Sequence, residues 1–374
     1  MNTPRLEIDL DKIYHNARTL KERLATRGIS VTGVTKAVLG STEVVGSLLR
    51  AGVTGLGDSR MENIESMRGA GLAGPMTLLR APMLSQVDRV IAQADISFNT
   101  ELDVISRLSS AAKRAKRTHG IVLMVELGDL REGIMPGDLE DTVRTMLRFP
   151  NLELKGIGTN LACHSGISPS GKNMAELSAL ADSVDETFGS TLSVVSGGNS
   201  ANLDWAFSGA KIGRINNLRL GEAILLGREA LHRHPIQGLH TDAIALVAEV
   251  IESKPKPTLP WGVAAQTAFG EQRAAIDQGE IFQTILAVGR QDIDPCGLQA
   301  PRVEILGASS DHLIVKSGDE LLPVGTEVTF QINYSALLRA MTSPFVEKVT
   351  QSRADEVVPS WNRLSTGNAF PPAP

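Results

Sequence analysis

One lysine in this sequence is placed to do covalent chemistry. Lys36 follows the apolar, β-branched run Val-Thr-Gly-Val-Thr (31–35), so it stands where a buried strand should end. A buried ammonium group must be paired or solvated, or it loses its proton, because an unpaired buried charge is costly. A neutral lysine is the nucleophile that forms a Schiff base with an aldehyde. Lys36 is therefore the first candidate catalytic residue, and the alternative is a surface lysine just past a strand.

Polar groups also follow the later apolar runs of the first 230 or so residues. The segment Ser-Gly-Gly-Asn-Ser (196–200) precedes a short helical pattern, so its N–H groups and the Ser200 hydroxyl could hold an anion. An ordinary turn is the alternative for this segment. Arg131 and Arg219 are each either a structural or solvated arginine or a guanidinium that binds a ligand. The candidates at the ends of these runs are Arg131, Asn160, Ser200, Arg219, Gly221 and Glu222.

The elements that must position these groups alternate between helix and strand. Helical patterns with one apolar face span 11–27, 100–116 and 172–188, and Ser41 is placed to cap a further short helix. Apolar runs without clear alternation lie between them, as is typical of parallel strands buried on both faces. Roughly eight such repeats predict an α/β fold, a (β/α)8 barrel over residues 11–234, rather than an open doubly wound sheet. The expected strands are 31–36, 53–57, 76–80, 94–98, 121–127, 154–161 and 191–195, and a last strand that holds residues 217–222.

The pattern changes near residue 235, where β-like runs separated by Gly and Pro begin. We expect a smaller, mostly β domain made of residues 235–350 together with the first strand, residues 1–10. A chain of 374 residues is also long enough for two domains. The tail, residues 351–374, is polar and aperiodic, so we expect it to be disordered or loosely docked.

Composition narrows the classes of partner. The net charge is −5 with acids and bases mixed along the chain, which disfavours nucleic acid. No apolar run approaches the roughly 18 residues of a membrane span, and the N-terminus carries no apolar signal core. Two distant cysteines, Cys163 and Cys296, suggest no disulfide framework. We expect a cytoplasmic protein that acts on a small molecule and binds neither nucleic acid nor membrane.

The order of these motifs resembles the alanine racemase family of fold-type III pyridoxal-phosphate enzymes. The resemblance is carried by Lys36, by Gly-Asp-Leu-Arg-Glu-Gly around Arg131, by Gly-Asn-Ser ending at Ser200, and by Leu-Arg-Leu-Gly-Glu around Arg219. The segments Val-Ser-Gly-Gly-Asn-Ser, Gly-Arg-Gln-Asp and Gly-Ala-Ser-Ser-Asp-His are most similar to the ornithine racemase branch. The similarity covers about residues 5–345, and it implies a barrel followed by a β domain.

The resemblance also implies roles around pyridoxal 5′-phosphate. Lys36 would anchor the cofactor as a Schiff base and move the α-proton on one face of the substrate. Arg219 would face the ring nitrogen; because arginine keeps its proton, the ring is a weaker electron sink, which suits racemisation. Arg131 would bind the substrate carboxylate, with Ser310 as a further substrate contact. The other implied cofactor contacts are Asn160, Ser200, the backbone of Gly221 and Glu222, and Tyr334.

The sequence departs from the family where the substrate and the second base are concerned. Alanine racemases use a tyrosine from the partner's β domain, but the two tyrosines here are Tyr14 and Tyr334, and Trp261 stands near the expected position. Met124 replaces a lysine that supports the arginine there, and Asn160 replaces a histidine that stacks on the ring. These changes argue against alanine as the substrate. The second base must be another residue type; the candidates are Asp311 and His312, which we favour, and Asp292, Cys163 and His164.

We therefore expect a pyridoxal-phosphate racemase that interconverts the L and D forms of a basic amino acid such as ornithine. From the family we also expect a homodimer with shared active sites. A substrate ammonium group needs a carboxylate, and the sequence offers Asp129, Asp292, Asp294 and Asp311 without choosing among them. The alternatives are an alanine or broad-specificity racemase, a non-catalytic pyridoxal-phosphate protein, a decarboxylase, or a barrel for another phosphate ligand. A decarboxylase would present an acid rather than Arg219, and a non-catalytic relative would usually stop after the barrel.

Overall fold

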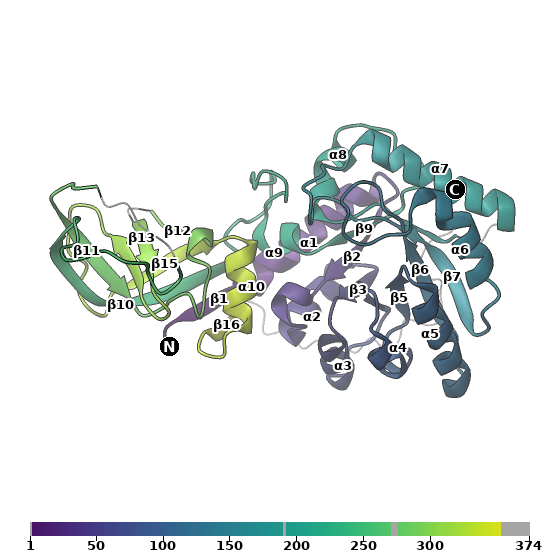
Figure 1. Ribbon diagram of the computed structural model, residues 1–374, viewed down its shortest axis with the longest axis horizontal. Helices are drawn as coiled ribbons and strands as arrows, with labels where there is room; N and C mark the ends of the chain where they lie inside the picture. The colour runs from purple at the N-terminus through teal and green to yellow at the C-terminus, as the bar shows by residue number, and fades with distance from the viewer. Residues whose placement is uncertain (1, 190–191, 271–275, 302, 353–374) are drawn as a thin grey trace. The chain divides into compact units, whose positions relative to one another are not determined.

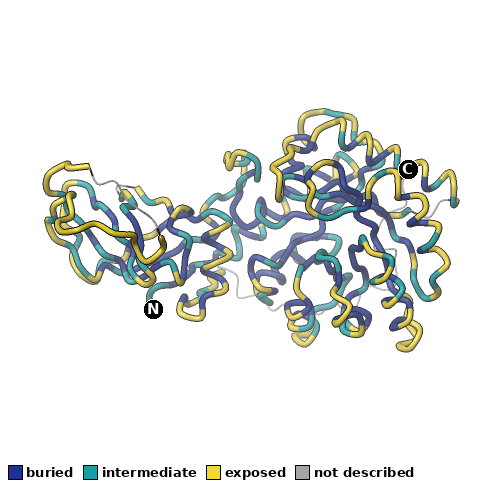
Figure 2. The backbone as a smooth tube through the Cα atoms, viewed as in Figure 1, coloured by how far each residue is buried: buried dark blue, intermediate teal, exposed yellow. Residues whose placement is uncertain are grey.

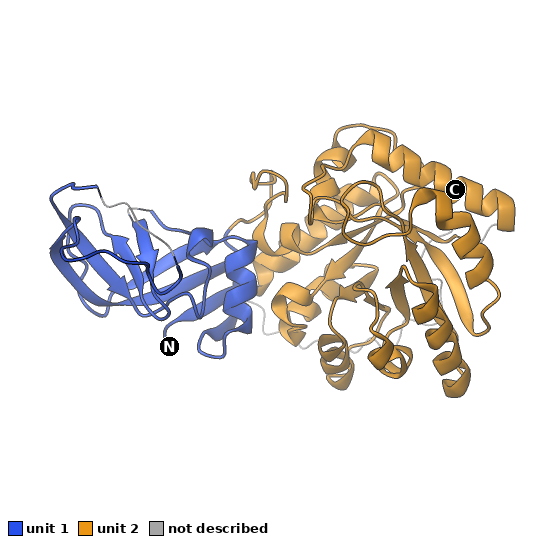
Figure 3. Cartoon of the chain, in the orientation of Figure 1, with its two compact units in different colours: residues 1–9, 242–352 blue, residues 10–241, 353–374 orange. Residues whose placement is uncertain are grey.

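The computed structural model describes residues 2–189, 192–270, 276–301 and 303–352. Its contacts divide these residues into two compact units, one formed by residues 2–9 with Asp242–Ser352 and the other by Leu10–Thr241 (Figure 3). Of the tail expected to be disordered, residues 353–374 lie outside the described residues, and Gln351 is the last residue of strand β16 (Glu347–Gln351).

The unit Leu10–Thr241 is a closed barrel, so the predicted (β/α)8 fold is confirmed (Figure 1). Neighbouring strands are parallel, and the barrel closes where Thr32 on the first strand pairs with Arg219 on the last. Strands buried on both faces read as apolar runs, and the six residues of β6 are all buried, as expected (Figure 2). Among the described residues the barrel strands are β2 (Ser30–Val34), β3 (Gly55–Asp58), β4 (Met76–Leu78), β5 (Ile96–Asn99), β6 (His119–Met124), β7 (Leu152–Gly158), β8 (Val194–Ser196) and β9 (Asn217–Leu220).

Helices connect these strands and pack through the apolar faces that the sequence predicts. In α1 the side chains of Ile13, Leu20 and Leu24 are fully buried. Ser41 caps α2 as expected, accepting a hydrogen bond from the Val44 N–H group at 3.4 Å. The helices of the barrel unit are α1 (Leu10–Ala25), α2 (Thr42–Arg50), α3 (Met61–Gly69), α4 (Val87–Gln93), α5 (Leu102–Ala115), α6 (Leu139–Met146), α7 (Gly171–Phe188), α8 (Leu203–Phe207) and α9 (Glu222–Leu226). No helix in the described part of the chain is both long and apolar enough to span a membrane.

The strand ends differ from the sequence-based expectation. The first barrel strand was expected to reach Lys36, but β2 ends at Val34 and Lys36 opens the short 3-10 helix η1 (Lys36–Val38). The Thr35 carbonyl accepts hydrogen bonds from the N–H groups of Val38 and Gly40, so the chain turns there instead of extending. The same holds for 154–161, where β7 ends at Gly158. Lys36 and Asn160 therefore stand on turns just beyond their strands, whereas Arg219 lies within β9.

The second unit is a mostly β domain whose described residues also form one α-helix, α10 (Tyr334–Thr342), and the short 3-10 helix η5 (Pro295–Gly297). Its sheet has the order β12-β15-β10-β11-β14-β13, and β1 (Arg5–Asp9) pairs with β10 and with β16. The first strand thus lies in this unit, as the sequence led us to expect. The other strands are β10 (Ile244–Pro257), β11 (Glu280–Leu286), β12 (Leu298–Gln299), β13 (Glu304–Ala308), β14 (Leu313–Lys316) and β15 (Glu327–Ile332).

Candidate active site

Lys36 stands on a turn that a buried carboxylate holds in place. The hydroxyl of Thr35, the preceding residue, donates to Asp58 Oδ2 at 2.6 Å. Asp58 Oδ1 accepts from the Arg60 N–H group at 2.9 Å and from Asn63 Nδ2 at 3.0 Å. Asp58 is fully buried, and burial raises the pKa of its carboxyl group. Asp58 was not among the residues predicted from the sequence, although an acid that ends the apolar run 53–57 was a signal for it.

The loops after β8 and β9 meet at Ser200. Its Oγ accepts a hydrogen bond from the Ala223 N–H group at 3.2 Å. Asn199 fixes the first loop, because its Oδ1 accepts from the Ala201 N–H group at 2.7 Å while its own N–H donates to Asn202 Oδ1 at 3.0 Å. Gly198 has a φ of 144°, and a Cβ there would lie 2.1 Å from Asn202 Oδ1, so this tight turn requires glycine.

These two loops leave donors for an anion. The backbone N–H groups of Ser200 and Glu222, which begin η4 (Ser200–Asn202) and α9, donate to no acceptor among the described residues. The Glu222 side chain forms an ion pair with Arg233. Burial raises the pKa of the Glu222 carboxyl group, and the charges of Arg233 and Lys36 oppose that shift. Lys36 thus lies within electrostatic range of Glu222, just beyond the neighbouring strand.

Arg219 is a buried cation held by neutral groups. Its Nη1 donates to Ser196 Oγ at 2.6 Å, and its Nη2 donates to the Thr159 carbonyl at 2.8 Å. The guanidinium carbon lies 5.1 Å from the centre of the Phe98 ring, on the far side of the barrel. Burial, with a smaller effect of the Arg131 charge, lowers the pKa of Arg219 to about 10.

The salt bridge that was the alternative for Arg219 is not found, because no carboxylate of the described residues lies within ion-pair distance of it. The group stays protonated at neutral pH, and its Nε–H group makes no hydrogen bond within the described parts of the chain. A charged donor is therefore available to a ligand.

Asn160 adds a second unused donor beside Arg219. Its Oδ1 accepts from Asn199 Nδ2 at 3.0 Å and from Arg219 Nη2 at 3.3 Å. Its Nδ2 atom is buried and has no hydrogen-bond partner among the described residues. A buried donor without a partner is costly, so this atom indicates a missing acceptor. Together with the Ser200 loop, it fits the binding of a polar, anionic cofactor.

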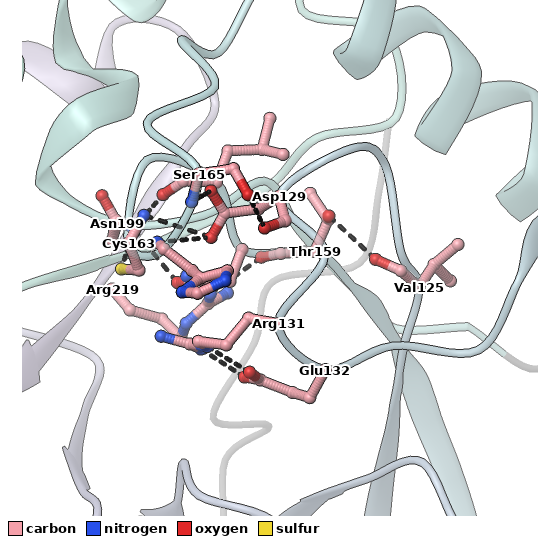
Figure 4. Close-up of polar contacts among 12 residues, drawn as sticks. Val125, Asp129, Arg131, Glu132, Thr159, Cys163, Ser165, Asn199 and Arg219 are labelled. Carbon is pink, nitrogen blue, oxygen red and sulfur yellow. Dashed lines mark hydrogen bonds and ion pairs between the residues drawn. The ribbon is translucent and has the colours of Figure 1, made fainter.

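The loop after β6 carries Arg131 with the carboxylates of Asp129 and Glu132 near it in sequence (Figure 4). Arg131 donates from Nε and Nη2 to the two oxygens of Glu132, which is the forked geometry that arginine uses for a carboxylate. Asp129 is fully buried and accepts hydrogen bonds from the N–H groups of the loop after β7, at residues Cys163, His164 and Ser165. Asp129 therefore fixes that loop, and its carboxylate is not free for a substrate ammonium group.

Cys163 and His164 lie on the same loop. The Cys163 side chain is exposed, and its Sγ lies 3.5 Å from Asn199 Nδ2. Cys163 is also within electrostatic range of both Arg131 and Arg219. The structure thus brings together, around the ends of the barrel strands, the candidates Lys36, Arg131, Asn160, Cys163, His164, Ser200, Arg219, Gly221 and Glu222.

The remaining candidates belong to the β domain. Asp311 and His312 share the turn between β13 and β14, with 2.9 Å between Asp311 Oδ1 and His312 Nδ1, and this hydrogen bond lowers the pKa of Asp311. Ser310 donates to Asp311 Oδ1 at 3.1 Å. Tyr334 begins α10. Trp261 stands near the position where alanine racemases have their tyrosine base. Its side chain is exposed in the segment between β10 and β11.

Two carboxylates offered for the substrate have partners within the β domain. Asp292 accepts from Ser343 Oγ at 2.7 Å and is buried. Asp294 accepts from Ser335 Oγ at 2.6 Å and from the Cys296 N–H group at 3.1 Å. Asp311 is the most exposed of the four carboxylates considered for the substrate ammonium group, with a side chain 69% exposed.

Comparison with known proteins gives the same assignment as these motifs. The family model described as "Alanine racemase, N-terminal domain" matches residues 8–229. An ornithine racemase of Acetoanaerobium sticklandii is 38% identical over 350 residues, covering 92% of this chain and 99% of the relative. A lysine racemase of Thermotoga maritima is 38% identical over 349 residues, covering 92% and 98%. The crystal structure of an alanine racemase from Streptomyces lavendulae shares the fold, with a TM-score of 0.72, 17% identity, and 94% and 98% coverage. The resemblance seen in the sequence is thereby confirmed, and the chain belongs to the alanine racemase family.

Proposed function

We propose that this protein is a pyridoxal-phosphate-dependent racemase of a basic amino acid, with ornithine and lysine as the first substrates to test. Both full-length relatives described above carry the name of a racemase of a basic amino acid. The single structural observation that carries the proposal is Arg219, a buried and protonated arginine whose described partners are all neutral.

The residues present fit pyridoxal 5′-phosphate. Lys36 would be its covalent anchor, and Ser200 with the N–H groups of Gly221 and Glu222 would hold its phosphate. Arg219 and the unpartnered Nδ2 of Asn160 would face polar atoms of its ring. Tyr334 is proposed as a further phosphate contact by analogy with the family. Bound there, the cofactor would withdraw electrons from the substrate α-carbon and so acidify the α-proton.

Arg219 would set the extent of that effect. An arginine donates a hydrogen bond but keeps its proton, so it would hold the ring nitrogen without protonating it. Moderate electron withdrawal favours removal and return of one proton over deeper bond changes. The presence of arginine at this position also disfavours a decarboxylase, which would use an acid there.

Arg131 would bind the substrate α-carboxylate through its forked N–H groups. In the structure this fork is filled by Glu132. The substrate carboxylate would therefore take the place of the Glu132 carboxylate, or bind to the remaining N–H groups of Arg131. Ser310 is proposed as a further substrate contact.

Two residues must move the α-proton on opposite faces of the substrate. Lys36 would serve one face at its Nζ atom. For the other face we propose Asp311 and His312, whose side chains are hydrogen-bonded to each other and exposed. Cys163 and His164, on the loop after β7, are the second candidates. If one of these residues is the second base, replacing it abolishes interconversion but leaves exchange of the α-proton with D₂O for one enantiomer.

The activity is tested by circular dichroism of single amino acids incubated with the cofactor-loaded protein. Loss of optical activity is expected from L-ornithine or L-lysine, and a much slower loss from L-alanine. A faster loss of optical activity from L-alanine than from L-ornithine or L-lysine would support the alternative of an alanine or broad-specificity racemase. No loss from any amino acid, with the cofactor bound, would leave the non-catalytic alternative. Lys36→Ala should remove the visible absorption of the bound cofactor, and its persistence would contradict the anchoring role.

We further propose a homodimer with shared sites and a cytoplasmic location. The segment between β10 and β11 exposes Trp261, Val263 and Ile276, a set of apolar side chains that a partner subunit would cover. Mixing Lys36→Ala with an inactive Asp311 or His312 variant should restore up to about a quarter of the activity if each site uses both subunits. Two unpaired cysteines, Cys163 and Cys296, support a reducing compartment.

A further inference from the structure

The interior of the barrel contains a chain of hydrogen bonds that ends on Arg219. Arg219 Nη1 donates to Ser196 Oγ at 2.6 Å, and the Ser196 hydroxyl donates to Asn217 Oδ1 at 2.7 Å. Asn217 Nδ2 then donates to Thr32 Oγ1 at 3.0 Å and to Ser30 Oγ at 3.2 Å. Ser196, Asn217 and Arg219 are all buried.

The strands explain why these residues meet. Asn217 lies two residues before Arg219 on β9, so both side chains point to the same face of the strand. Ser196 is on β8 and Thr32 is on β2, the two strands that flank β9 in the barrel. Asn217 therefore links three neighbouring strands in the layer next to Arg219.

The direction of each hydrogen bond is fixed along this chain. Because the Asn217 amide donates to Thr32 and Ser30, its carbonyl oxygen faces Ser196. That oxygen accepts a hydrogen bond from the Ser196 hydroxyl, so a lone pair of Ser196 Oγ is left to accept from the guanidinium. Hydrogen bonds in such a chain polarise one another, so Ser196 becomes a better acceptor for a cation.

We propose that Ser196 and Asn217 are positioning residues that fix the orientation of the Arg219 guanidinium and leave its Nε–H group for the ligand. The part of this proposal that concerns the cofactor rests on the proposed function. The orientation itself is a property of the protein without cofactor, so the two can be tested separately.

The first test measures solvent exchange of the Arg219 guanidinium protons by NMR of cofactor-free protein with ¹⁵N-labelled arginine, assigned with Arg219→Lys. Ser196→Ala should speed that exchange by about tenfold or more, since it removes a hydrogen bond to a charged group. Ser196→Cys, a weaker acceptor of similar shape, should fall between. Asn217→Asp should slow the exchange instead, because a carboxylate attracts the guanidinium. Ser193→Ala, an exposed serine at the edge of β8, is the matched control and should change nothing.

The second test measures pyridoxal-phosphate affinity and the absorption spectrum of the bound cofactor. Ser196→Ala should weaken binding about tenfold and shift the spectrum, and Asn217→Leu should add no further effect in that background because it acts through Ser196. Unchanged exchange in Ser196→Ala, or an equal change in Ser193→Ala, would overturn the positioning role. If exchange responds as expected but the wild-type protein binds no cofactor, the positioning stands and the proposed function fails.

Discussion

One buried histidine should contribute a distinct share of the pH dependence of barrel stability between pH 7 and 5. His119 begins β6, is 2% exposed, and its Nε2 lies 2.8 Å from Ser97 Oγ. Burial lowers the pKa of His119 from 6.5 to about 4. As the pH falls below 6.5, His119 binds a proton in the unfolded chain but stays neutral in the folded chain. The stabilisation is therefore complete above pH 6.5 and is lost as the pH falls toward 4.

These two pKa values set the size of the effect. At pH 5 the unfolded histidine is almost fully protonated and the folded one almost fully neutral, so the loss is about 2 kcal/mol relative to pH 8. His119→Gln keeps a hydrogen-bonding side chain and removes the titration. The free energy of unfolding of the wild type should thus fall by about 2 kcal/mol more than that of the variant between pH 8 and pH 5.

Urea unfolding followed by tryptophan fluorescence measures this difference. Trp205 is buried in α8 of the barrel. The other two tryptophans of the sequence are removed by Trp261→Phe and Trp361→Phe, so that the fluorescence reports on the barrel alone. Carboxyl groups titrate equally in both proteins, so the variant is the control for every titration other than that of His119. Parallel curves of stability against pH for the wild type and the His119→Gln variant, from pH 8 to 5, would contradict this role of His119.

Three further predictions concern the rim of the barrel. Ser200→Ala should weaken pyridoxal-phosphate binding about tenfold in a fluorescence titration, because a neutral hydroxyl and its contact to Ala223 are lost; unchanged affinity would contradict the phosphate role. Asp129→Asn should lower the free energy of unfolding by about 2 kcal/mol and expose residues 163–165 to limited proteolysis; an unaltered digestion pattern would oppose this. Arg131→Lys should raise KM for the amino acid about tenfold with less effect on kcat, since lysine lacks the fork; an equal loss in kcat would point to a role beyond carboxylate binding.

Much of the candidate site follows from the sequence because of how a barrel is built. Parallel strands all end at the same rim, so polar residues that follow separate apolar runs must meet there. Lys36, Ser200 and Arg219 were predicted in this way, and the structure gathers them at the strand ends. Helix faces were predictable for a similar reason, since the spacing of Ile13, Leu20 and Leu24 depends only on the helical period.

The sequence alone determined the class of fold, the family, and which residue types stand at the ends of the strands, because these depend on local periodicity and on motif order. The hydrogen-bond partner of each polar residue, in contrast, depends on the tertiary structure. Asp58 holds Thr35 from 23 positions away, and Asn217 holds Ser196 from 21 positions away. Asp129, which the sequence offered to the substrate, instead binds backbone groups 34 to 36 residues later. Such pairs arise when neighbouring strands are aligned in register, and that register is a property of the closed barrel rather than of any local segment.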